Sequence, residues 1–165
     1  MREPGQLTRE LADEAATRAA GAALARALAG LPAETVMVTL SGDLGAGKTT
    51  FARGFLEALG ARAPIRSPTY TLIESYPLDT RTVHHLDWYR LGAGADLEGI
   101  GYRDLAGPGQ WLLVEWPERV PEVAALADLA VTLEYRPAGR GLRVHALTPL
   151  GHSAIAATKT AKALE

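Results

Sequence analysis

The spacing of apolar residues along the chain predicts helices and strands in a definite order. Leucines recur at helical spacing in the first part, so a helix is predicted from about Leu7 to Ala29, with Thr8 as its candidate cap. Residues 36–40 form a nearly continuous apolar run, which is typical of a strand buried on both faces of a parallel sheet. Apolar side chains four positions apart then predict a second helix over 48–59.

The rest of the chain is predicted to be richer in strands. The predicted elements are strands at 70–76, 82–86 and 111–114, a short helical or loop segment at 96–105, and a hairpin of strands 129–135 and 142–147 about the turn 137–141. The tail from about Ser153 is predicted to be weakly helical or frayed. This order predicts one α/β domain over residues 1–165, with a mixed, mostly parallel sheet, helices on both faces and a C-terminal antiparallel hairpin.

A glycine-rich segment lies between the first predicted strand and the second predicted helix. Residues 42–49 read GDLGAGKT and match the phosphate-loop pattern G-x-x-x-x-G-K-[ST] in full. Such a loop turns backbone N–H groups toward phosphates, its lysine reaches the β- and γ-phosphates, and its threonine hydroxyl ligates Mg²⁺. We therefore predict that ATP and Mg²⁺ bind at Gly45, Ala46, Gly47, Lys48, Thr49 and Thr50.

Two acidic residues follow later predicted strands and are candidate partners of this loop. Glu115 ends a run of four apolar residues, and Asp87 ends the strand at 82–86. A phosphate-loop site needs an acid at a neighbouring strand end to hold Mg²⁺ and a group that positions the attacking water. The more apolar run before Glu115 favours it as the metal ligand together with Thr49, but residue types alone leave the two roles interchangeable.

Other polar residues are weaker candidates. His84 and His85 are neighbours on one strand and face opposite sides, so they cannot share a metal. The segment 67–70 reads SPTY and lies where nucleotide switches carry a hydroxyl that senses the γ-phosphate. Thr69 is therefore a candidate, although a proline-containing turn explains the same residues.

Composition narrows the class of protein further. A formal net charge of −2 does not indicate generic binding to nucleic acid, and a chain without cysteine has no disulfide or thiolate nucleophile. The apolar stretches are about strand length, short of the ~20 residues of a membrane span, and the first residues do not resemble a secretory signal. We therefore expect a cytoplasmic protein without a membrane partner.

Four segments taken together resemble the TsaE family, the ATPases of bacterial tRNA threonylcarbamoyladenosine biosynthesis. They are 41–50 (SGDLGAGKTT), 67–70 (SPTY), 85–91 (HLDWYRL) and 113–117 (LVEWP). The phosphate loop alone is shared by many proteins, whereas the four segments in this order are far more specific. Trp88 departs from the family, whose members often have an aliphatic residue there.

The resemblance implies more than the residues alone do. Proteins of this family hydrolyse ATP and act with partners of the TsaB and TsaD families, which modify the adenosine 3′ of the anticodon in ANN-decoding tRNAs; contact with tRNA is thus indirect. Hydrolysis is suggested to reset the complex. By resemblance, Thr49 and Glu115 hold Mg²⁺, and Asp87 is a catalytic or switch-coupled acid. The further nucleotide contacts implied are Asp13, Thr69, Glu118 and Arg140.

Two other classes of phosphate-loop protein are alternatives. A small-molecule kinase needs a lid with arginines, and the region after Glu115 offers only Arg119 before the late strands, then Arg136 and Arg140 near the predicted hairpin. A regulatory GTPase is suggested by residues 96–99, which match D-x-x-G, but the chain has no N-K-x-D motif for reading guanine.

Overall fold

The computed structural model describes residues 3–62, 64–65, 68, 71–89, 91 and 102–163. The chain folds into strands and helices in the following order: β1 (Gln6–Leu11), α1 (Glu14–Ala29), β2 (Val36–Ser41), α2 (Lys48–Ala58), β3 (Ile73–Pro77), β4 (Thr82–Asp87), the 3₁₀ helix η1 (Tyr102–Leu105), β5 (Gln110–Glu115), the 3₁₀ helix η2 (Pro117–Arg119), α3 (Pro121–Ala124), β6 (Leu129–Arg136), β7 (Gly139–Ala146) and α4 (Pro149–Ala163).

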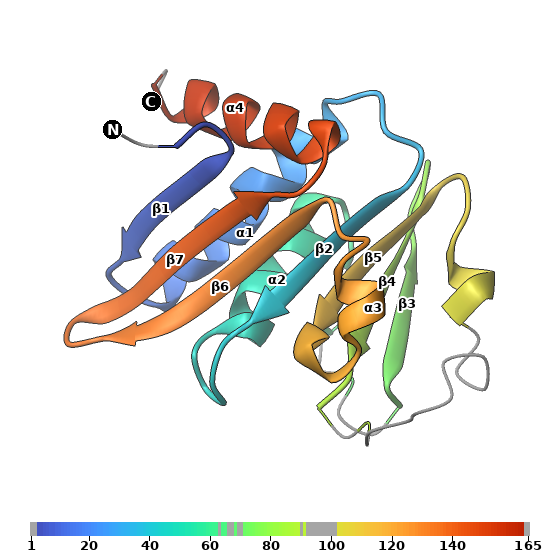
Figure 1. Ribbon diagram of the computed structural model, residues 1–165, viewed down its shortest axis with the longest axis horizontal. Helices are drawn as coiled ribbons and strands as arrows, with labels where there is room; N and C mark the ends of the chain where they lie inside the picture. Colours follow the sequence, from blue (N-terminus) through green and yellow to red (C-terminus); the bar gives the residue numbers. More distant parts are fainter. Residues whose placement is uncertain are drawn as a thin grey trace.

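The strands form one mixed sheet of seven in the order β1-β7-β6-β2-β5-β4-β3 (Figure 1). The four neighbours β6, β2, β5 and β4 run parallel to each other. Strands β7 and β3 run the opposite way, and β1, antiparallel to β7, shares the direction of the central strands. Five strands thus point the same way, and β6 and β7 form the C-terminal hairpin, which confirms the predicted mixed, mostly parallel sheet.

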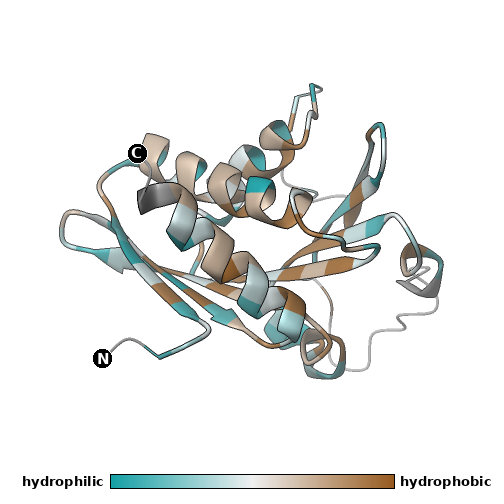
Figure 2. Ribbon diagram, turned by 90° about the horizontal axis from the view of Figure 1, so that it is seen from above, coloured by the Kyte–Doolittle hydropathy of each residue, from teal (hydrophilic) through white to brown (hydrophobic). Residues whose placement is uncertain are grey.

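Helices cover both faces of the sheet, as predicted. Along β2, Val38 packs into a core under α1, α2 and α4, while Met37 packs into a second core with α3. Both cores contain β5 residues as well, Leu113 on the first face and Leu112 on the second. This two-sided burial explains why both strands are continuous apolar runs. Hydrophobic segments concentrate where the sheet meets the helices (Figure 2).

The N-terminal prediction is wrong in its first part. Residues Gln6–Leu11 form an edge strand paired with β7, and the helix begins only at Glu14. Its cap is Asp13, whose side chain accepts the N–H of Ala16 at 2.8 Å, and not Thr8. Leu7 and Leu11 are both buried, and a spacing of four residues suits a strand face as well as a helix face. Only the pairing with β7 selects the strand.

The C-terminal predictions also need correction. The tail is neither weak nor frayed over Pro149–Ala163, because α4 buries Ala154 and Ile155 in the larger core. In the hairpin, Arg136 pairs directly with Gly139, so the turn consists of residues 137 and 138, and Arg140 lies in β7 rather than in the turn.

Smaller differences concern the middle of the chain. The strand predicted at 70–76 runs over Ile73–Pro77, and Tyr70 lies outside the described residues. Of the segment predicted at 96–105 the structure describes only its last residues, where Tyr102–Leu105 form a 3₁₀ helix. None of the helices in the described part of the chain is both long and apolar enough to cross a membrane.

Helices α1 and α2 approach closely because each has a glycine at the contact. A Cβ atom on Gly54 would lie 1.9 Å from the carbonyl oxygen of Arg18, and one on Gly21 would lie 2.1 Å from that of Phe51. Neither obstacle is a flexible side chain, so a larger residue must push the helices apart. Since α2 starts at the phosphate loop, this contact also fixes the loop.

Gly54→Ala is expected to destabilise the protein by about 2 kcal/mol or more, the cost of overpacking outweighing the better helix propensity of alanine. The measurement is chemical denaturation. Gly30→Ala is the matched control, because Gly30 has φ −81° and a Cβ there would meet nothing closer than 3.6 Å. Equal stability of the two variants would show that the helices adjust without cost.

Candidate functional site

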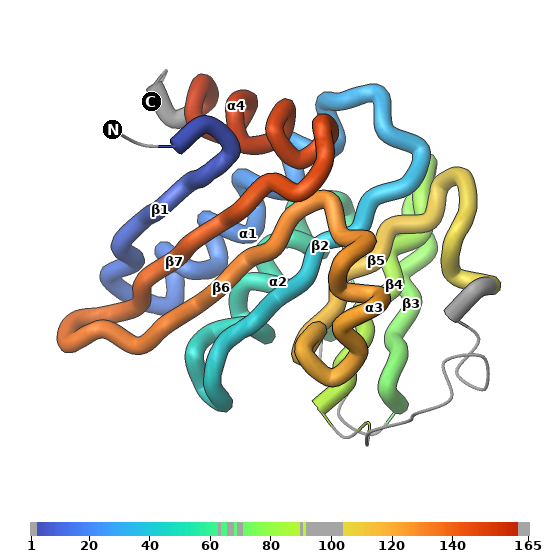
Figure 3. The backbone as a smooth tube through the Cα atoms, in the orientation of Figure 1, coloured from blue at the N-terminus to red at the C-terminus, as the bar shows by residue number. Residues whose placement is uncertain are grey.

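The phosphate loop lies between β2 and α2, at the sheet edge where the parallel strands β2, β4 and β5 end (Figure 3). Its geometry depends on glycine at two points. Gly47 caps α2 with φ 109°, in the left-handed region. At Gly42 a Cβ atom would lie 2.4 Å from the carbonyl oxygen of Leu133. The sequence motif therefore has the strand–loop–helix context that such a loop requires.

Lys48 occupies the first turn of α2 and is folded against the loop. Its Nζ donates to the carbonyl oxygens of Gly42 at 2.5 Å and Asp43 at 3.0 Å, and lies 4.3 Å from the ring centroid of Trp116. Burial lowers the pKa of Lys48, and the carboxylates of Glu115, Glu118, Asp87 and Asp43 oppose this by raising it. The ammonium is thus a desolvated cation facing a group of acids.

Asp87 and Glu115 lie side by side, since they pair in register at the ends of β4 and β5. Both are largely buried, with 9% and 2% exposure. They share a cavity of about 330 Å³ with the phosphate loop. Its lining consists of Leu44, Gly45, Gly47, Lys48, Thr49, Thr50, Asp87, Tyr89, Glu115 and Trp116. The structure thus brings both predicted acids to the predicted lysine and threonine.

Backbone hydrogen bonds hold the ends of these strands together. Trp116 donates its N–H to the carbonyl oxygen of Leu40 at 3.2 Å, and Trp88 donates to that of Glu115 at 3.1 Å. The carboxylate of Asp87 accepts the N–H of Tyr89 at 3.0 Å. Trp116 has φ 60°, a costly conformation for a bulky residue, and it places the indole beside Lys48. Backbone groups as well as side chains therefore fix the strand ends that carry Asp87 and Glu115.

The two histidines separate as the strand pattern predicts. His84 turns to one face, where its ring contacts Ser75 at 2.8 Å and Gln110 at 2.5 Å. His85 lies on the opposite face, fully buried, with Nε2 2.6 Å from Oε2 of Glu115. The two do not share a metal site.

The β6–β7 hairpin contacts the phosphate loop from the other side. The Tyr135 hydroxyl donates to the carbonyl oxygen of Leu44 at 2.6 Å, and Arg140 donates to that of Gly45 at 3.3 Å. The guanidinium of Arg140 also lies 4.4 Å from the Tyr135 ring centroid. Sequence reasoning singled out Arg140 but missed Tyr135 and Trp116, because an aromatic residue in a strand or after an acid carries no motif.

The other residues predicted to contact the nucleotide are Asp13, Glu118 and Thr69. Asp13 uses its side chain to cap α1, whose first turn adjoins the loop: a Cβ on Gly47 would lie 3.3 Å from Thr17 Cγ2. Glu118 lies in the 3₁₀ helix Pro117–Arg119 and is near enough to raise the pKa of Lys48. Thr69 lies outside the described residues.

The donor set at the cavity suits Mg²⁺ better than a transition metal. Mg²⁺ prefers a few carboxylate and hydroxyl oxygens and keeps several waters. Thr49, Asp87 and Glu115 offer such oxygens in one cavity. Within the described ranges no cluster of three or more histidines, cysteines and acids could hold a metal ion.

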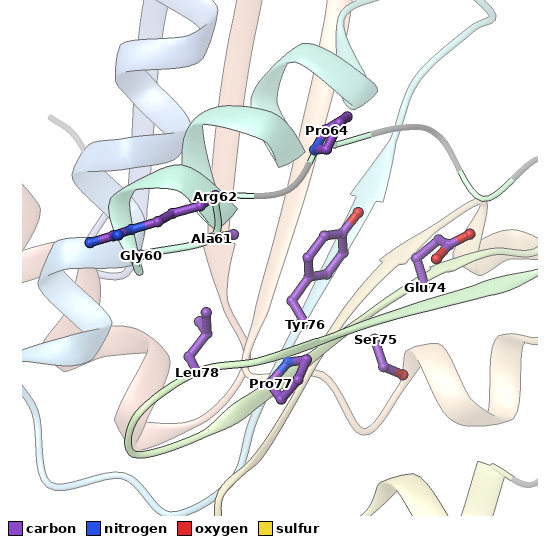
Figure 4. Close-up of a pocket in the computed structure, with 9 residues that line it drawn as sticks. All are labelled: Gly60, Ala61, Arg62, Pro64, Glu74, Ser75, Tyr76, Pro77 and Leu78. Carbon is purple, nitrogen blue, oxygen red and sulfur yellow. The ribbon is translucent and has the colours of Figure 1, made fainter.

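Two larger cavities lie elsewhere on the molecule. One of about 480 Å³ lies between residues 60–62 with Pro64 on one side and β3 on the other, with Tyr76 and Glu74 in its lining (Figure 4). The other, of about 510 Å³, lies between α1, α4 and the strands β1 and β7. Neither is lined by any of the predicted nucleotide-binding residues, so the smaller cavity at the phosphate loop remains the candidate site.

A parallel strand, a phosphate loop and a helix, with two acids on adjacent strand ends, place this chain in the P-loop NTPase class of α/β folds. Comparison with known proteins identifies the family within that class. The family model of the threonylcarbamoyl adenosine biosynthesis protein TsaE matches residues 11–142. The chain belongs to the TsaE family.

Individual relatives agree with this assignment. The tRNA threonylcarbamoyladenosine biosynthesis protein TsaE of Haemophilus influenzae is 38% identical over 152 residues, which are 92% of this chain and 96% of the relative. The protein of the same name from Bacillus subtilis is 36% identical over 98 residues, 59% of this chain and 61% of the relative. The crystal structure of Bacillus subtilis YdiB matches with a TM-score of 0.75 and 26% identity, over 98% of this chain and 99% of that one.

Family membership does not favour the kinase alternative. The contacts of the arginines near the hairpin do not favour it either. Arg136 pairs with Glu134 at 2.9 Å and Arg140 donates to the loop itself, so neither belongs to a lid in the part of the chain that the structure describes. Residues 96–99, the basis of the GTPase alternative, lie outside the described residues.

Proposed function

We propose that this chain binds ATP with Mg²⁺ at the phosphate loop and hydrolyses it in the service of tRNA threonylcarbamoyladenosine biosynthesis. The observation that carries the proposal is the single cavity that Lys48, Thr49, Asp87 and Glu115 line together. The names of the relatives support the pathway, and the geometry supports the chemistry.

Each residue has a role that follows from its chemistry. Lys48 binds the β- and γ-phosphates, where its desolvated charge acts more strongly than it would in water. Thr49 and Glu115 would hold Mg²⁺, which neutralises charge that develops on the phosphates. Asp87, paired with Glu115 on the neighbouring strand, would orient the attacking water.

The contacts between the hairpin and the loop support a nucleotide role for Arg140. Its guanidinium donates to the Gly45 carbonyl, which places Arg140 against the loop that would hold the nucleotide. Asp13 and Glu118 flank the same loop, from the start of α1 and from η2. We include both, and Thr69 on the basis of sequence, among the residues that contact the nucleotide.

Hydrolysis by the isolated chain should be slow. An arginine that stabilises the transferred phosphoryl group is worth ~10³ to ~10⁵ in rate, and Arg140, which contacts the phosphate loop, is engaged with a backbone carbonyl. A net charge of −2 gives the chain little attraction for tRNA phosphates. We therefore infer that it works in the cytoplasm with partners of the TsaB and TsaD families, which bring the ANN-decoding tRNA.

The test is a hydrolysis assay on the purified chain with Mg²⁺ and ATP. We expect release of ADP and phosphate well below ~10 per second, and an increase when the two partner proteins are added. Transfer of the γ-phosphate to a metabolite would support a kinase instead. Turnover at tens per second by the chain alone would contradict the need for partners.

A further inference from the structure

The buried contact between His85 and Glu115 has no part in the functions described so far. Nε2 of His85 and Oε2 of Glu115 are 2.6 Å apart, and their side chains are 0% and 3% exposed. Glu115 lines the phosphate-loop cavity, whereas His85 is not among its lining residues. The histidine thus contacts the acid from the side that does not line the cavity where a nucleotide would bind.

The geometry determines what the histidine does to the carboxylate. As a ligand of Mg²⁺, Glu115 would be an ionised carboxylate, which only accepts hydrogen bonds, so we assign the proton of this contact to Nε2 of His85. The bond engages Oε2, so Oε1 is the oxygen of Glu115 that this contact does not use. Because both groups are buried, the carboxylate has little freedom to rotate away.

We propose that His85 is a positioning residue for Glu115, which holds one carboxylate oxygen so that the other is presented to the Mg²⁺ of bound nucleotide. The inference rests on the proposed role of Glu115 as a metal ligand. Hydrogen bonds from outer residues orient the ligands of metals in proteins, and losing one typically lowers metal affinity ~10- to ~100-fold. His85 itself touches neither metal nor nucleotide.

The test compares two amides at position 85 in the full chain. In His85→Gln the amide nitrogen reaches about as far as Nε2, whereas the shorter side chain of His85→Asn does not. Mn²⁺ binding to the ADP complex is measured by electron paramagnetic resonance, and ADP binding without metal by calorimetry in EDTA. We expect His85→Asn to bind Mn²⁺ ~10- to ~100-fold more weakly and His85→Gln to remain near the wild type, with ADP affinity in EDTA unchanged in both.

Glu115→Gln separates this inference from the function on which it rests. If Glu115→Gln leaves Mn²⁺ affinity unchanged, Glu115 is not a ligand and both ideas are wrong. If it weakens Mn²⁺ binding while the two position-85 variants bind alike, only the role of His85 is wrong. The rate of ATP hydrolysis should be near the wild-type value in His85→Gln and lower in His85→Asn. In His85→Asn, kcat should fall by a larger factor than KM rises.

A measurement on the wild-type chain covers the case in which His85→Asn does not fold. The Nε2–H resonance of His85 should shift when Mg²⁺ is added to the ADP complex, because the carboxylate that accepts this proton then binds the cation. It should not shift in Glu115→Gln. An unchanged resonance in the wild type would overturn the proposal.

Discussion

Lys48→Ala is expected to abolish productive ATP binding and to leave the fold intact. The ammonium is the fixed positive charge of the phosphate loop, and the largely buried Lys48 side chain lines the cavity beside it. Losing a buried charged partner costs 2–5 kcal/mol or more, so we expect ATP affinity to fall by about a hundredfold or more by calorimetry.

The expectation that the fold survives has its own physical basis. Because burial lowers the pKa of Lys48, the folded chain holds this proton less tightly than the unfolded chain, and the charged side chain opposes folding. Alanine removes that cost together with the hydrogen bonds to Gly42 and Asp43. Lys159→Ala, in α4, is the matched control. Retained ATP affinity in Lys48→Ala would contradict the assignment of the loop.

Glu115→Gln is expected to lower Mg²⁺-dependent turnover far more than nucleotide affinity. The substitution keeps the shape of the side chain and removes the charge that would hold the cation. Removing one group that stabilises developing charge can cost about a hundredfold or more in kcat. The measurement is ATP hydrolysis against Mg²⁺ concentration, with exposed Glu122→Gln in α3 as the control.

Substitution of the neighbouring acid, Asp87, is expected to affect the rate rather than the Mg²⁺ dependence. Asp87→Asn should reduce the rate at saturating Mg²⁺ while leaving the Mg²⁺ dependence in place. If Asp87→Asn instead removes the metal dependence and Glu115→Gln does not, the two roles must be exchanged. Their pairing in register means that either result still locates the chemistry at the ends of β4 and β5.

The sequence predicted the central part of this molecule well because there several signals agree. The loop at 42–49 follows a buried strand and precedes a helix, and the strands leading to Asp87 and Glu115 are apolar runs. Carboxyl ends of parallel strands meet at one edge of a sheet, so their convergence on the loop could be expected. The structure places them in one cavity.

The outer parts were less predictable for a definite physical reason. Leu7 and Leu11 fit a helix or a strand equally, and the choice depends on β7, which lies more than a hundred residues later. The same dependence on distant partners applies to Tyr135, whose hydroxyl binds the Leu44 carbonyl, and to His85, whose ring supports Glu115. The periodicity of apolar residues predicts which face of the sheet a side chain lies on, but not which side chain of a neighbouring element it contacts.

Repeated modification of tRNA in a reconstituted system tests the central claim most directly. The wild-type chain, proteins of the TsaB and TsaD families, ANN-decoding tRNA, ATP and an activated threonylcarbamoyl donor would be combined, and threonylcarbamoyladenosine would be counted per transferase complex. We predict many rounds with the wild-type chain and a stop after about one round when it is omitted or replaced by Lys48→Ala. Equal multiple turnover in all three reactions would contradict the account.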